Sequence, residues 1–211
     1  MVKVKLCGIT NDKDAVWAAG LGVDFMGFNF YKDSPRVISD ANAKKIIGKL
    51  PPFIGTVGVF VNEDIKEIKR IVRKTGIRIV QLHGDESVEY LQELKNNVPG
   101  IEIIKAFRMS GEEVLSRIPA YDVNYYLLDA CVEGTAGGTG EVFNWELAVK
   151  AKEFGKPVIL AGGITPENVG EAIKKVKPFC VDTASGVERL PRRKDYNKVH
   201  DLLERVREAS I

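Results

Sequence analysis

The chain has 211 residues, which fits one large domain with a substantial buried core. Its 31 Lys and Arg residues nearly balance 29 Asp and Glu residues, so the net charge of +2 favours neither nucleic acid nor an anionic membrane as partner. No apolar run approaches the roughly 20 residues that cross a bilayer, no signal-peptide core opens the chain, and Cys7, Cys131 and Cys180 show no close pairing; we therefore expect a reduced, cytoplasmic protein.

Short β-rich runs alternate with amphipathic helical patterns along the whole chain. The predicted strands are, in order, Lys3 to Cys7, Phe25 to Phe30, Ile54 to Val61, Ile79 to His83, Ile101 to Ala106, Tyr125 to Asp129, Val158 to Ala161 and Phe179 to Asp182. The helical patterns begin near Asp12, Ser39, Glu63, Glu86, Gly111, Asn144, Thr165 and Asp195. Several begin at a Ser, Thr, Asp or Asn residue that can cap a first helical turn.

Eight βα units with short connections require parallel strands joined by right-handed crossovers, and eight such units close a (βα)8, or TIM, barrel. A doubly wound open sheet is the alternative, but it would gather ligand groups at one crevice. Here polar residues occupy the ends of many predicted strands: Cys7, Asn29, His83, Lys105, Asp129 and Asp182. We therefore predict an α/β fold, with residues 1–211 forming a single-domain (βα)8 barrel of eight parallel strands.

The first predicted strand carries a candidate base. Side chains alternate along a strand, so Lys3, Lys5 and Cys7 share one face while Val4 and Leu6 take the other. The apolar face belongs against helices, which turns the thiol toward the barrel interior. A free cysteine is often only a small buried hydrophobe, but Lys5 on the same face can favour the thiolate.

Asp129 is the candidate acid, because it ends a nearly continuous apolar strand at the mouth of the barrel. Burial there would raise the carboxyl pKa and keep a proton available near neutrality; a helix cap or a solvated loop residue is the alternative. The first and sixth strands stand across the mouth from each other, so Cys7 and Asp129 can flank one substrate. Asp182 ends the strand beside the first one, and we expect it to pair with Lys5.

Two glycine turns lie where (βα)8 barrels commonly bind phosphate. Gly162 and Gly163 follow the seventh strand, and Ser185 and Gly186 follow the eighth. Backbone N–H groups in such turns can surround a dianion. A longer glycine-rich stretch after the sixth strand is either flexible or a candidate lid over the site. Its glycines are Gly137, Gly138 and Gly140.

Three further polar residues are candidates for binding a substrate. Arg36 follows a proline turn after the second strand, and its planar guanidinium suits a carboxylate. Gln81 and His83 share the inward face of the fourth strand, where they can orient a ligand or support other polar groups. The other histidine, His200, lies on the last predicted helix, and no His/Cys cluster has the spacing of a metal site, so we expect no metal.

These residues stand in motifs that span essentially the whole chain. The motifs are Lys5-Leu6-Cys7-Gly8-Ile9-Thr10, Gly27-Phe28-Asn29-Phe30, Ser34-Pro35-Arg36, Val57-Gly58-Val59-Phe60-Val61-Asn62, Gln81-Leu82-His83-Gly84, Leu128-Asp129, Gly137-Gly138-Thr139-Gly140, Ala161-Gly162-Gly163-Ile164 and Asp182-Thr183-Ala184-Ser185-Gly186-Val187-Glu188. Together they resemble the phosphoribosylanthranilate isomerases of tryptophan biosynthesis.

The resemblance implies an Amadori rearrangement of N-(5-phosphoribosyl)anthranilate to 1-(2-carboxyphenylamino)-1-deoxyribulose 5-phosphate, without metal or cofactor. It implies that Asp129 protonates the furanose ring oxygen and that Cys7 removes the C2 proton. By the same resemblance Arg36 takes the anthranilate carboxylate, and the two glycine turns take the phosphate.

The chain departs from the family pattern at two places. Ala184 stands where a serine is more usual, and Pro191-Arg192 stands where a Pro-Gly turn is expected. We expect the basic run from Arg192 to Lys194 to be a solvated loop.

Two other functions remain open: another phosphosugar-converting (βα)8 enzyme with the same phosphate turns, or a non-catalytic barrel that binds a phosphometabolite. The pair of Cys7 and Asp129 argues against the first, and the additional presence of Arg36 argues against the second. The expected partner is a phosphorylated small molecule, with no nucleic acid and no membrane. The chain is expected to be a monomer or a homodimer.

Overall fold

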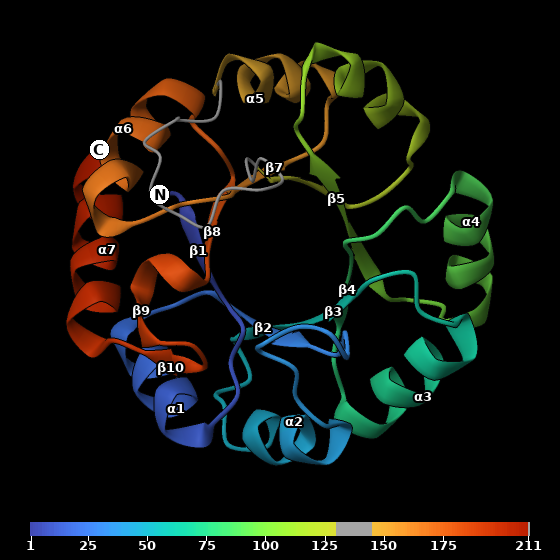
Figure 1. Cartoon of the computed structure of the whole chain (residues 1–211), viewed down its shortest axis with the longest axis horizontal. Helices are drawn as coiled ribbons and strands as arrows, with labels where there is room; N and C mark the ends of the chain where they lie inside the picture. Colours follow the sequence, from blue (N-terminus) through green and yellow to red (C-terminus); the bar gives the residue numbers. More distant parts are fainter. Residues whose placement is uncertain (130–144, 211) are drawn as a thin grey trace.

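The computed structural model describes residues 1–129 and 145–210 (Figure 1). Within them, eight parallel strands pair in sequence order and close into a barrel, with the last strand on the first. The barrel strands are β1 (Lys3–Cys7), β2 (Phe25–Asn29), β3 (Gly55–Phe60), β4 (Ile79–Leu82), β5 (Glu102–Arg108), β6 (Tyr125–Asp129), β7 (Val158–Ala161) and β8 (Cys180–Thr183). The closed order confirms the predicted (βα)8 barrel and is incompatible with an open sheet.

A ring of helices surrounds the barrel (Figure 1). The α-helices are α1 (Asp12–Leu21), α2 (Asp40–Ile47), α3 (Ile65–Thr75), α4 (Val88–Asn97), α5 (Trp145–Ala151), α6 (Pro166–Val176) and α7 (Tyr196–Ala209). Short polar side chains cap six of them: Asn11, Ser39, Asp64, Ser87, Thr165 and Asp195. Each cap accepts a hydrogen bond from a backbone N–H of the first turn, which has no partner within the helix. None of the helices among the described residues is long and apolar enough to cross a membrane.

The helix predicted near Gly111 differs from the others. The structure has a 3₁₀ helix there, η1 (Glu112–Ala120), with Pro119 inside it and no side-chain cap at Gly111. Proline has no backbone N–H and clashes with the preceding helical turn, so a regular α-helix is disfavoured at this position. Two shorter 3₁₀ helices are η2 (Lys152–Phe154) and η3 (Ser185–Val187).

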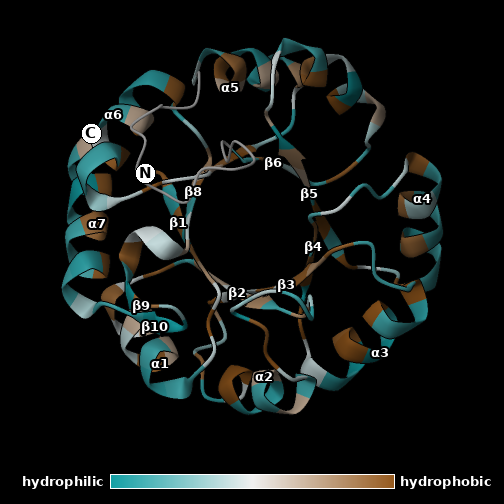
Figure 2. Ribbon diagram, in the orientation of Figure 1, coloured by the Kyte–Doolittle hydropathy of each residue, from teal (hydrophilic) through white to brown (hydrophobic). Residues whose placement is uncertain are grey.

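Apolar side chains pack on both sides of the barrel wall. Val4 and Leu6 belong to the outer core between strands and helices, as the alternation in β1 predicts. A smaller cluster fills the interior with Val57, Ile79, Ile104, Ala106, Leu127, Ile159, Ala161 and Cys180. The helices carry hydrophilic residues toward the outer rim of the ring (Figure 2). The barrel wall therefore separates a large outer core, against the helices, from a smaller inner one.

The prediction that Lys105 ends a strand at the barrel mouth was wrong. Strand β5 continues to Arg108, and its neighbours Ile104 and Ala106 face the interior, so Lys105 faces the helices. Its ammonium lies 2.7 Å from the Glu86 carboxylate and donates to the Gly84 carbonyl at 2.7 Å. Lys105 is therefore part of a buried structural ion pair outside the barrel.

The expected solvated loop before the last helix is instead a hairpin. Strands β9 (Glu188–Leu190) and β10 (Arg193–Lys194) pair antiparallel beside α1 (Figure 1). Lys194 is only 4% exposed, and its backbone N–H donates to Asp14 at 2.9 Å. Arg192 takes a φ of 72° at the turn, the conformation that the missing glycine would favour. The residues before α1 also hold the hairpin, because Thr10 Oγ1 and Asn11 Nδ2 donate to the Arg192 carbonyl.

Candidate active site

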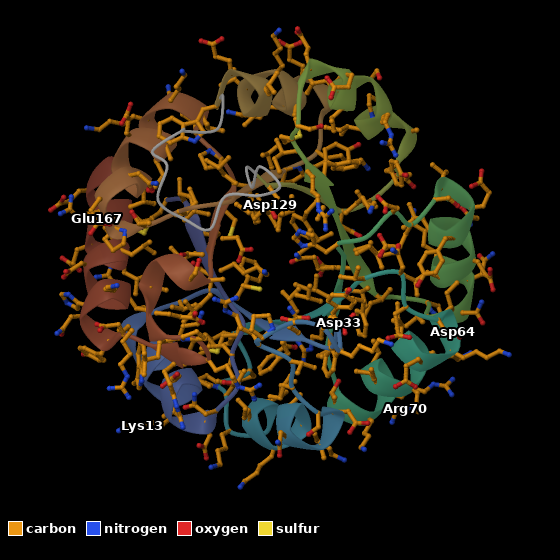
Figure 3. The ribbon with its side chains drawn as sticks, in the orientation of Figure 1. Lys13, Asp33, Asp64, Arg70, Asp129 and Glu167 are labelled. Carbon is orange, nitrogen blue, oxygen red and sulfur yellow. The ribbon has the colours of Figure 1, made fainter. Side chains whose placement is uncertain are left out.

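A cavity of about 300 Å³ opens at the carboxyl ends of the barrel strands. It contains every residue that we predicted to act on or bind the substrate: Cys7, Arg36, Gln81, His83, Asp129, Gly162, Gly163, Asp182, Ser185 and Gly186. Figure 3 places Asp129 toward the barrel opening, whereas Lys13, Arg70 and Glu167 project from the surrounding helices. The fold thus brings residues from the first and last strands into one site.

Lys5 lies one inward position below Cys7 on β1 and is completely buried. Its Nζ donates to Asp182 Oδ1 at 2.9 Å, across the β1–β8 seam that closes the barrel. This contact is the predicted pairing. Burial disfavours the ammonium, but Asp182 and Cys7 outweigh that effect and raise the pKa of Lys5. A permanent positive charge therefore sits beneath the thiol.

The thiol itself is partly exposed to the cavity, and burial raises its pKa above the ordinary value of 9. Lys5 and Lys194 lower the pKa of Cys7, but they do not overcome its burial. Lys5 therefore favours the thiolate, as expected from the sequence, while burial of the group opposes it. A side chain at Gly27 would come within 2.9 Å of Cys7 Sγ and 3.3 Å of Lys5 Nζ, so glycine on β2 leaves room for both groups.

Asp129 is the end of a hydrogen-bonded row of three side chains. The Gln81 amide nitrogen donates to His83 Nδ1 at 2.8 Å, and His83 Nε2 lies 3.1 Å from Asp129 Oδ2. In this arrangement a neutral His83 carries its proton on Nε2 and donates it to the Asp129 carboxylate. Gln81 is 1% exposed and supports His83 from below. Of the two roles left open for Gln81, the geometry matches support of another polar group.

The same row can also accept a protonated Asp129. Gln81 Oε1 is buried and has no hydrogen-bond partner among the described residues. With the Gln81 amide rotated by half a turn, Oε1 would accept a hydrogen bond from the His83 tautomer that carries its proton on Nδ1. His83 Nε2 would then accept the proton of a neutral Asp129. The two orientations of Gln81 thus match the two protonation states that a general acid passes through.

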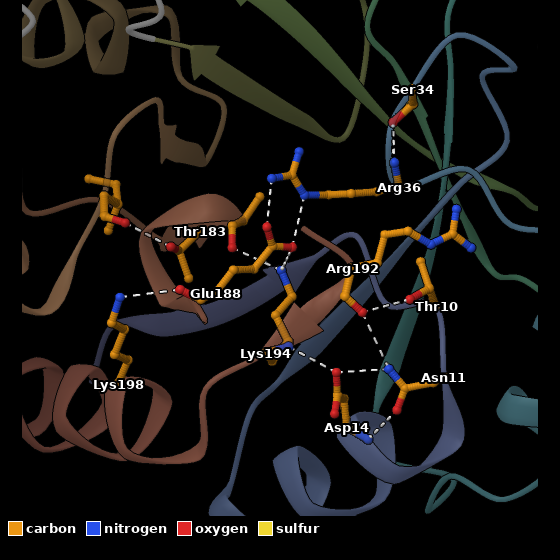
Figure 4. Close-up of polar contacts among 12 residues, drawn as sticks. Thr10, Asn11, Asp14, Ser34, Arg36, Thr183, Glu188, Arg192, Lys194 and Lys198 are labelled. Carbon is orange, nitrogen blue, oxygen red and sulfur yellow. Dashed lines mark hydrogen bonds and ion pairs between the residues drawn. The ribbon is translucent and has the colours of Figure 1, made fainter. Parts of the chain in front are cut away.

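Arg36 is held by a residue that sequence reasoning missed. Its Nε and Nη2 donate to the two carboxylate oxygens of Glu188 at 2.9 and 2.7 Å (Figure 4). Burial alone would raise the pKa of Glu188, but Arg36 and Lys194 together lower it. The two partners are 152 positions apart in the sequence, so no local spacing could have indicated their contact.

Asn29 shapes the segment that carries Arg36. Its side-chain oxygen accepts from the Tyr31 backbone at 3.0 Å, and its amide donates to Ser34 Oγ at 2.9 Å. Ser34 Oγ in turn accepts from the Arg36 backbone N–H at 3.1 Å. We had noted Asn29 only as a polar strand end. It therefore fixes the turn after β2 rather than serving as an isolated cavity residue.

The two glycine turns pack directly on each other. Gly162 and Gly163 have φ values of 83° and 67°, which favour glycine. A Cβ atom at Gly186 would lie 2.1 Å from the Ile164 carbonyl oxygen, and Thr183 Oγ1 donates to that same oxygen at 2.7 Å. The turns after β7 and β8 therefore form one continuous backbone surface at the cavity. The proposed lid glycines, Gly137, Gly138 and Gly140, lie outside the described residues.

Arg108 is a strand residue that the prediction missed, although it is exposed and is not among the described residues that line the cavity. It ends β5, shares the inward face with Ala106, and stands in register with Asp129 on β6. The predicted strand stopped at Ala106, so the inward position two residues later was not considered. Extending the alternation by one pair of residues would have indicated it.

The fold and its cavity define an enzyme of the (βα)8-barrel class, with its site built from loops and side chains at the carboxyl ends of the strands. A family model of N-(5'-phosphoribosyl)anthranilate (PRA) isomerase matches residues 4–205. The chain therefore belongs to the N-(5'-phosphoribosyl)anthranilate isomerase family.

Individual relatives match this chain over nearly its full length. The chain is 45% identical to the N-(5'-phosphoribosyl)anthranilate isomerase of Trichlorobacter lovleyi, covering 99% of this chain and 100% of that one. The crystal structure of phosphoribosyl anthranilate isomerase from Thermotoga maritima has a TM-score of 0.92 at 38% identity, covering 99% and 100% of the two chains. Another solved structure, of such an isomerase in complex with reduced 1-(o-carboxyphenylamino)-1-deoxyribulose 5-phosphate, has a TM-score of 0.88 at 37% identity, with the same coverage.

Proposed function

We infer that this chain catalyses the Amadori rearrangement of N-(5'-phosphoribosyl)anthranilate to 1-(2-carboxyphenylamino)-1-deoxyribulose 5-phosphate in tryptophan biosynthesis. The observation that carries this conclusion is the single cavity holding Cys7, Asp129, Arg36 and the paired glycine turns, in a chain of this isomerase family. An aldose-to-ketose rearrangement needs a proton donor, a proton acceptor and a grip on both ends of the substrate. The cavity offers a group for each task.

Asp129 opens the sugar ring in this proposal. It donates a proton to the furanose oxygen, the bond from that oxygen to C1 breaks, and the anilino nitrogen forms a protonated Schiff base with C1. The Asp129 carboxylate that remains accepts a hydrogen bond from His83 Nε2–H, the tautomer that the Gln81 amide N–H supports by donating to Nδ1. The row thereby stabilises the Asp129 carboxylate after it gives up its proton.

Cys7 removes the C2 proton. The electron pair of the C2–H bond forms the C1–C2 double bond, the Schiff base nitrogen becomes neutral, and the product is an enolamine. Proton loss from the C2 hydroxyl and protonation of C1 then give the ketone. The Lys5 ammonium stabilises the thiolate that this step requires, since it lies beneath Cys7 and remains charged through its pairing with Asp182.

The two ends of the substrate bind to two different kinds of hydrogen-bond donor. The guanidinium of Arg36 takes the anthranilate carboxylate through parallel hydrogen bonds. Backbone N–H groups of the turns at Gly162-Gly163 and Ser185-Gly186 take the dianionic phosphate. Holding both ends keeps C1 and C2 between acid and base, and this orientation lowers the entropic cost of the reaction.

The deciding experiment is turnover of freshly generated N-(5'-phosphoribosyl)anthranilate, with spontaneous decay subtracted and the product identified by chromatography. Formation of the ribulose isomer in proportion to enzyme is the expected result. A folded chain that binds the phosphorylated product without turnover would indicate a binding barrel. Turnover of a different phosphosugar alone would indicate another barrel enzyme.

We further propose that residues 1–211 act as one cytoplasmic catalytic domain, as a monomer or a homodimer. Its partner is the phosphorylated small molecule, and neither nucleic acid, membrane, metal nor cofactor takes part. Sedimentation measures the oligomeric state directly. Full activity after exhaustive chelation supports the part of the proposal that concerns metals, whereas recovery of lost activity on adding one metal contradicts it.

A further inference from the structure

Glu188 is a buried carboxylate that the mechanism above leaves without a task. Only 5% of its side chain is exposed, yet it belongs to the short hairpin strand β9 and not to the barrel. It binds the Nε and Nη2 edge of the Arg36 guanidinium with two parallel hydrogen bonds (Figure 4). Such a forked pair fixes the plane of the guanidinium as well as its position.

Because Glu188 binds the Nε and Nη2 edge, another edge of the Arg36 guanidinium remains open. A guanidinium can offer a second pair of parallel donors through Nη1 and the remaining hydrogen of Nη2. Among the described residues, Nη1 has no hydrogen-bond acceptor, and Arg36 lines the cavity. The arginine stem passes over Gly8, where a Cβ atom would lie 2.4 Å from Arg36 Cδ. Gly8 and Glu188 thus hold the stem and the head of the side chain in one orientation.

A carboxylate partner would ordinarily cancel the charge of Arg36, but here a second cation compensates it. Lys194 Nζ donates to Glu188 Oε1 at 3.1 Å and to the Ala184 carbonyl at 2.9 Å. Its side chain is 1% exposed, and the hairpin is anchored to α1 through the contact of Lys194 with Asp14. Two positive groups therefore surround one negative group, and the cluster keeps a net positive charge for an incoming anion.

We propose that Glu188, with its charge balanced by Lys194, is a positioning residue that presets Arg36 and makes the enzyme select substrates whose aromatic ring carries a carboxylate. The proposal rests on the function inferred above and adds the source of its specificity. A guanidinium already fixed in orientation loses less conformational entropy when the carboxylate binds. The competing account is a purely structural one, in which Glu188 only attaches the hairpin to the turn after β2.

The test compares two substrates on each variant. One is N-(5'-phosphoribosyl)anthranilate, and the other is the same aminosugar phosphate made from aniline, which lacks the carboxylate. Glu188→Gln removes the charge and one of the two matched acceptors. We expect kcat/KM for the carboxylated substrate to fall on the order of ten- to a hundredfold, mainly through KM, while that for the aniline compound changes less than about twofold. Equal losses on both substrates would overturn the proposal.

Two further variants test whether the effect of Glu188→Gln comes from its carboxylate and acts through Arg36. Lys198→Met is the matched control, because Lys198 Nζ donates to the backbone carbonyl of Glu188 at 3.2 Å and does not touch its carboxylate. It should keep the wild-type preference between the substrates. In an Arg36→Ala background, adding Glu188→Gln should change kcat/KM for the carboxylated substrate by less than about twofold, because the group it positions is gone. A further large loss there would contradict the proposal.

Lys194→Met tests the charge balance. Glu188 then cancels Arg36, and KM for the carboxylated substrate should rise without a matching rise for the aniline compound. If Glu188→Gln does not fold, Glu188→Asp replaces it, since the shorter side chain keeps the charge but cannot span both guanidinium nitrogens. An unchanged substrate preference in a folded Glu188→Asp enzyme would overturn the proposal. Absence of turnover by the wild-type chain would instead refute the inferred function, so the two failures are distinct.

Discussion

Two buried lysines lie on opposite faces of the same barrel wall. Lys5 on β1 faces the interior and binds Asp182 at 2.9 Å, while Lys105 on β5 faces the helices and binds Glu86 at 2.7 Å. Both lysines are buried, and each pairs with a carboxylate. Lys5 lies beneath the cavity thiol, whereas Lys105 packs near the rings of Phe107 and Tyr121, 5.9 and 5.8 Å from its ammonium. The chemistry of a buried ion pair therefore does not decide its role; the face of the strand does.

The largest effects should come from the interior face. Cys7→Ser and Asp129→Asn each remove a group to which we assign a proton transfer, without a large change of volume. We expect each to lower kcat by about 10²- to 10⁴-fold, the range typical of general acid–base groups, with thermal unfolding close to that of the wild type. Steady-state kinetics with the anthranilate substrate measure the loss. Substantial turnover by both variants would remove the proposed division between a reactive interior and a structural exterior.

Lys5→Met and Lys105→Met test the comparison itself. Each leaves a buried carboxylate without its cation, so each should lower the free energy of unfolding by about 3–5 kcal/mol. Only Lys5→Met should also lower kcat, on the order of tenfold or more, because the thiolate of Cys7 loses its neighbouring charge. Denaturant unfolding and kinetics on the folded fraction separate the two quantities. Equal kcat values in the two variants would show that the face of the strand does not matter.

The pH dependence gives a finer test of the interior pair. Burial raises the pKa of Cys7 from its ordinary value, so kcat/KM should increase with pH through the alkaline range as the thiol ionises. Lys5 lowers the pKa of Cys7, and its removal should therefore shift this rise to still higher pH. Kinetics at fixed ionic strength, together with thiolate absorbance of the free enzyme, follow the titration. A rise that is complete near pH 7 would contradict the raised pKa of Cys7.

The smallest effect is expected at Arg192, which lies in the hairpin turn away from both ion pairs and serves as a reference. Arg192 takes a φ of 72°, a left-handed conformation that costs a non-glycine residue about 1–2 kcal/mol. Arg192→Gly should therefore stabilise the fold by about 1 kcal/mol or less, since glycine also has a more flexible unfolded chain. The Arg192 carbonyl, which accepts from Thr10 at 2.9 Å, is retained. Chemical denaturation measures the change, and a loss of stability would show that the arginine side chain contributes more than the strain costs.

The inward and outward faces of β1 were predicted correctly, because the predicted bounds of that strand agree with the observed ones. The inward position of Cys7 and the pairing of Lys5 with Asp182 followed from this agreement and from closure of an eight-strand barrel. In β5 the prediction ended two residues early, which misplaced Lys105 and hid Arg108. A small error at the end of a strand thus decides which side chains are assigned to the site.

Contacts between distant segments were harder to predict. The turns at Gly162-Gly163 and Ser185-Gly186 carry a local signal, because their backbone geometry and close packing require glycine. Glu188 carries none that identifies Arg36 as its partner, since the hairpin that brings it to the mouth depends on contacts with α1. The pKa of Cys7 likewise depends on the balance between its burial and two lysines, which sequence order does not supply.

Closure of the barrel between its first and last strands has a consequence for protein synthesis. Cys7 leaves the ribosome early, but the groups around it come from the end of the chain: Asp182 meets Lys5 across 177 positions, and Glu188 meets Arg36 across 152. A nascent chain that ends before β8 carries the thiol and Lys5 but lacks Asp182, Glu188 and Lys194. A circular permutant in which α7 is linked to β1 and the chain is reopened at another surface loop should preserve the site, provided β1 and β8 still pair. The order in which the residues are made is therefore unimportant to the finished enzyme, while the seam between these two strands is indispensable.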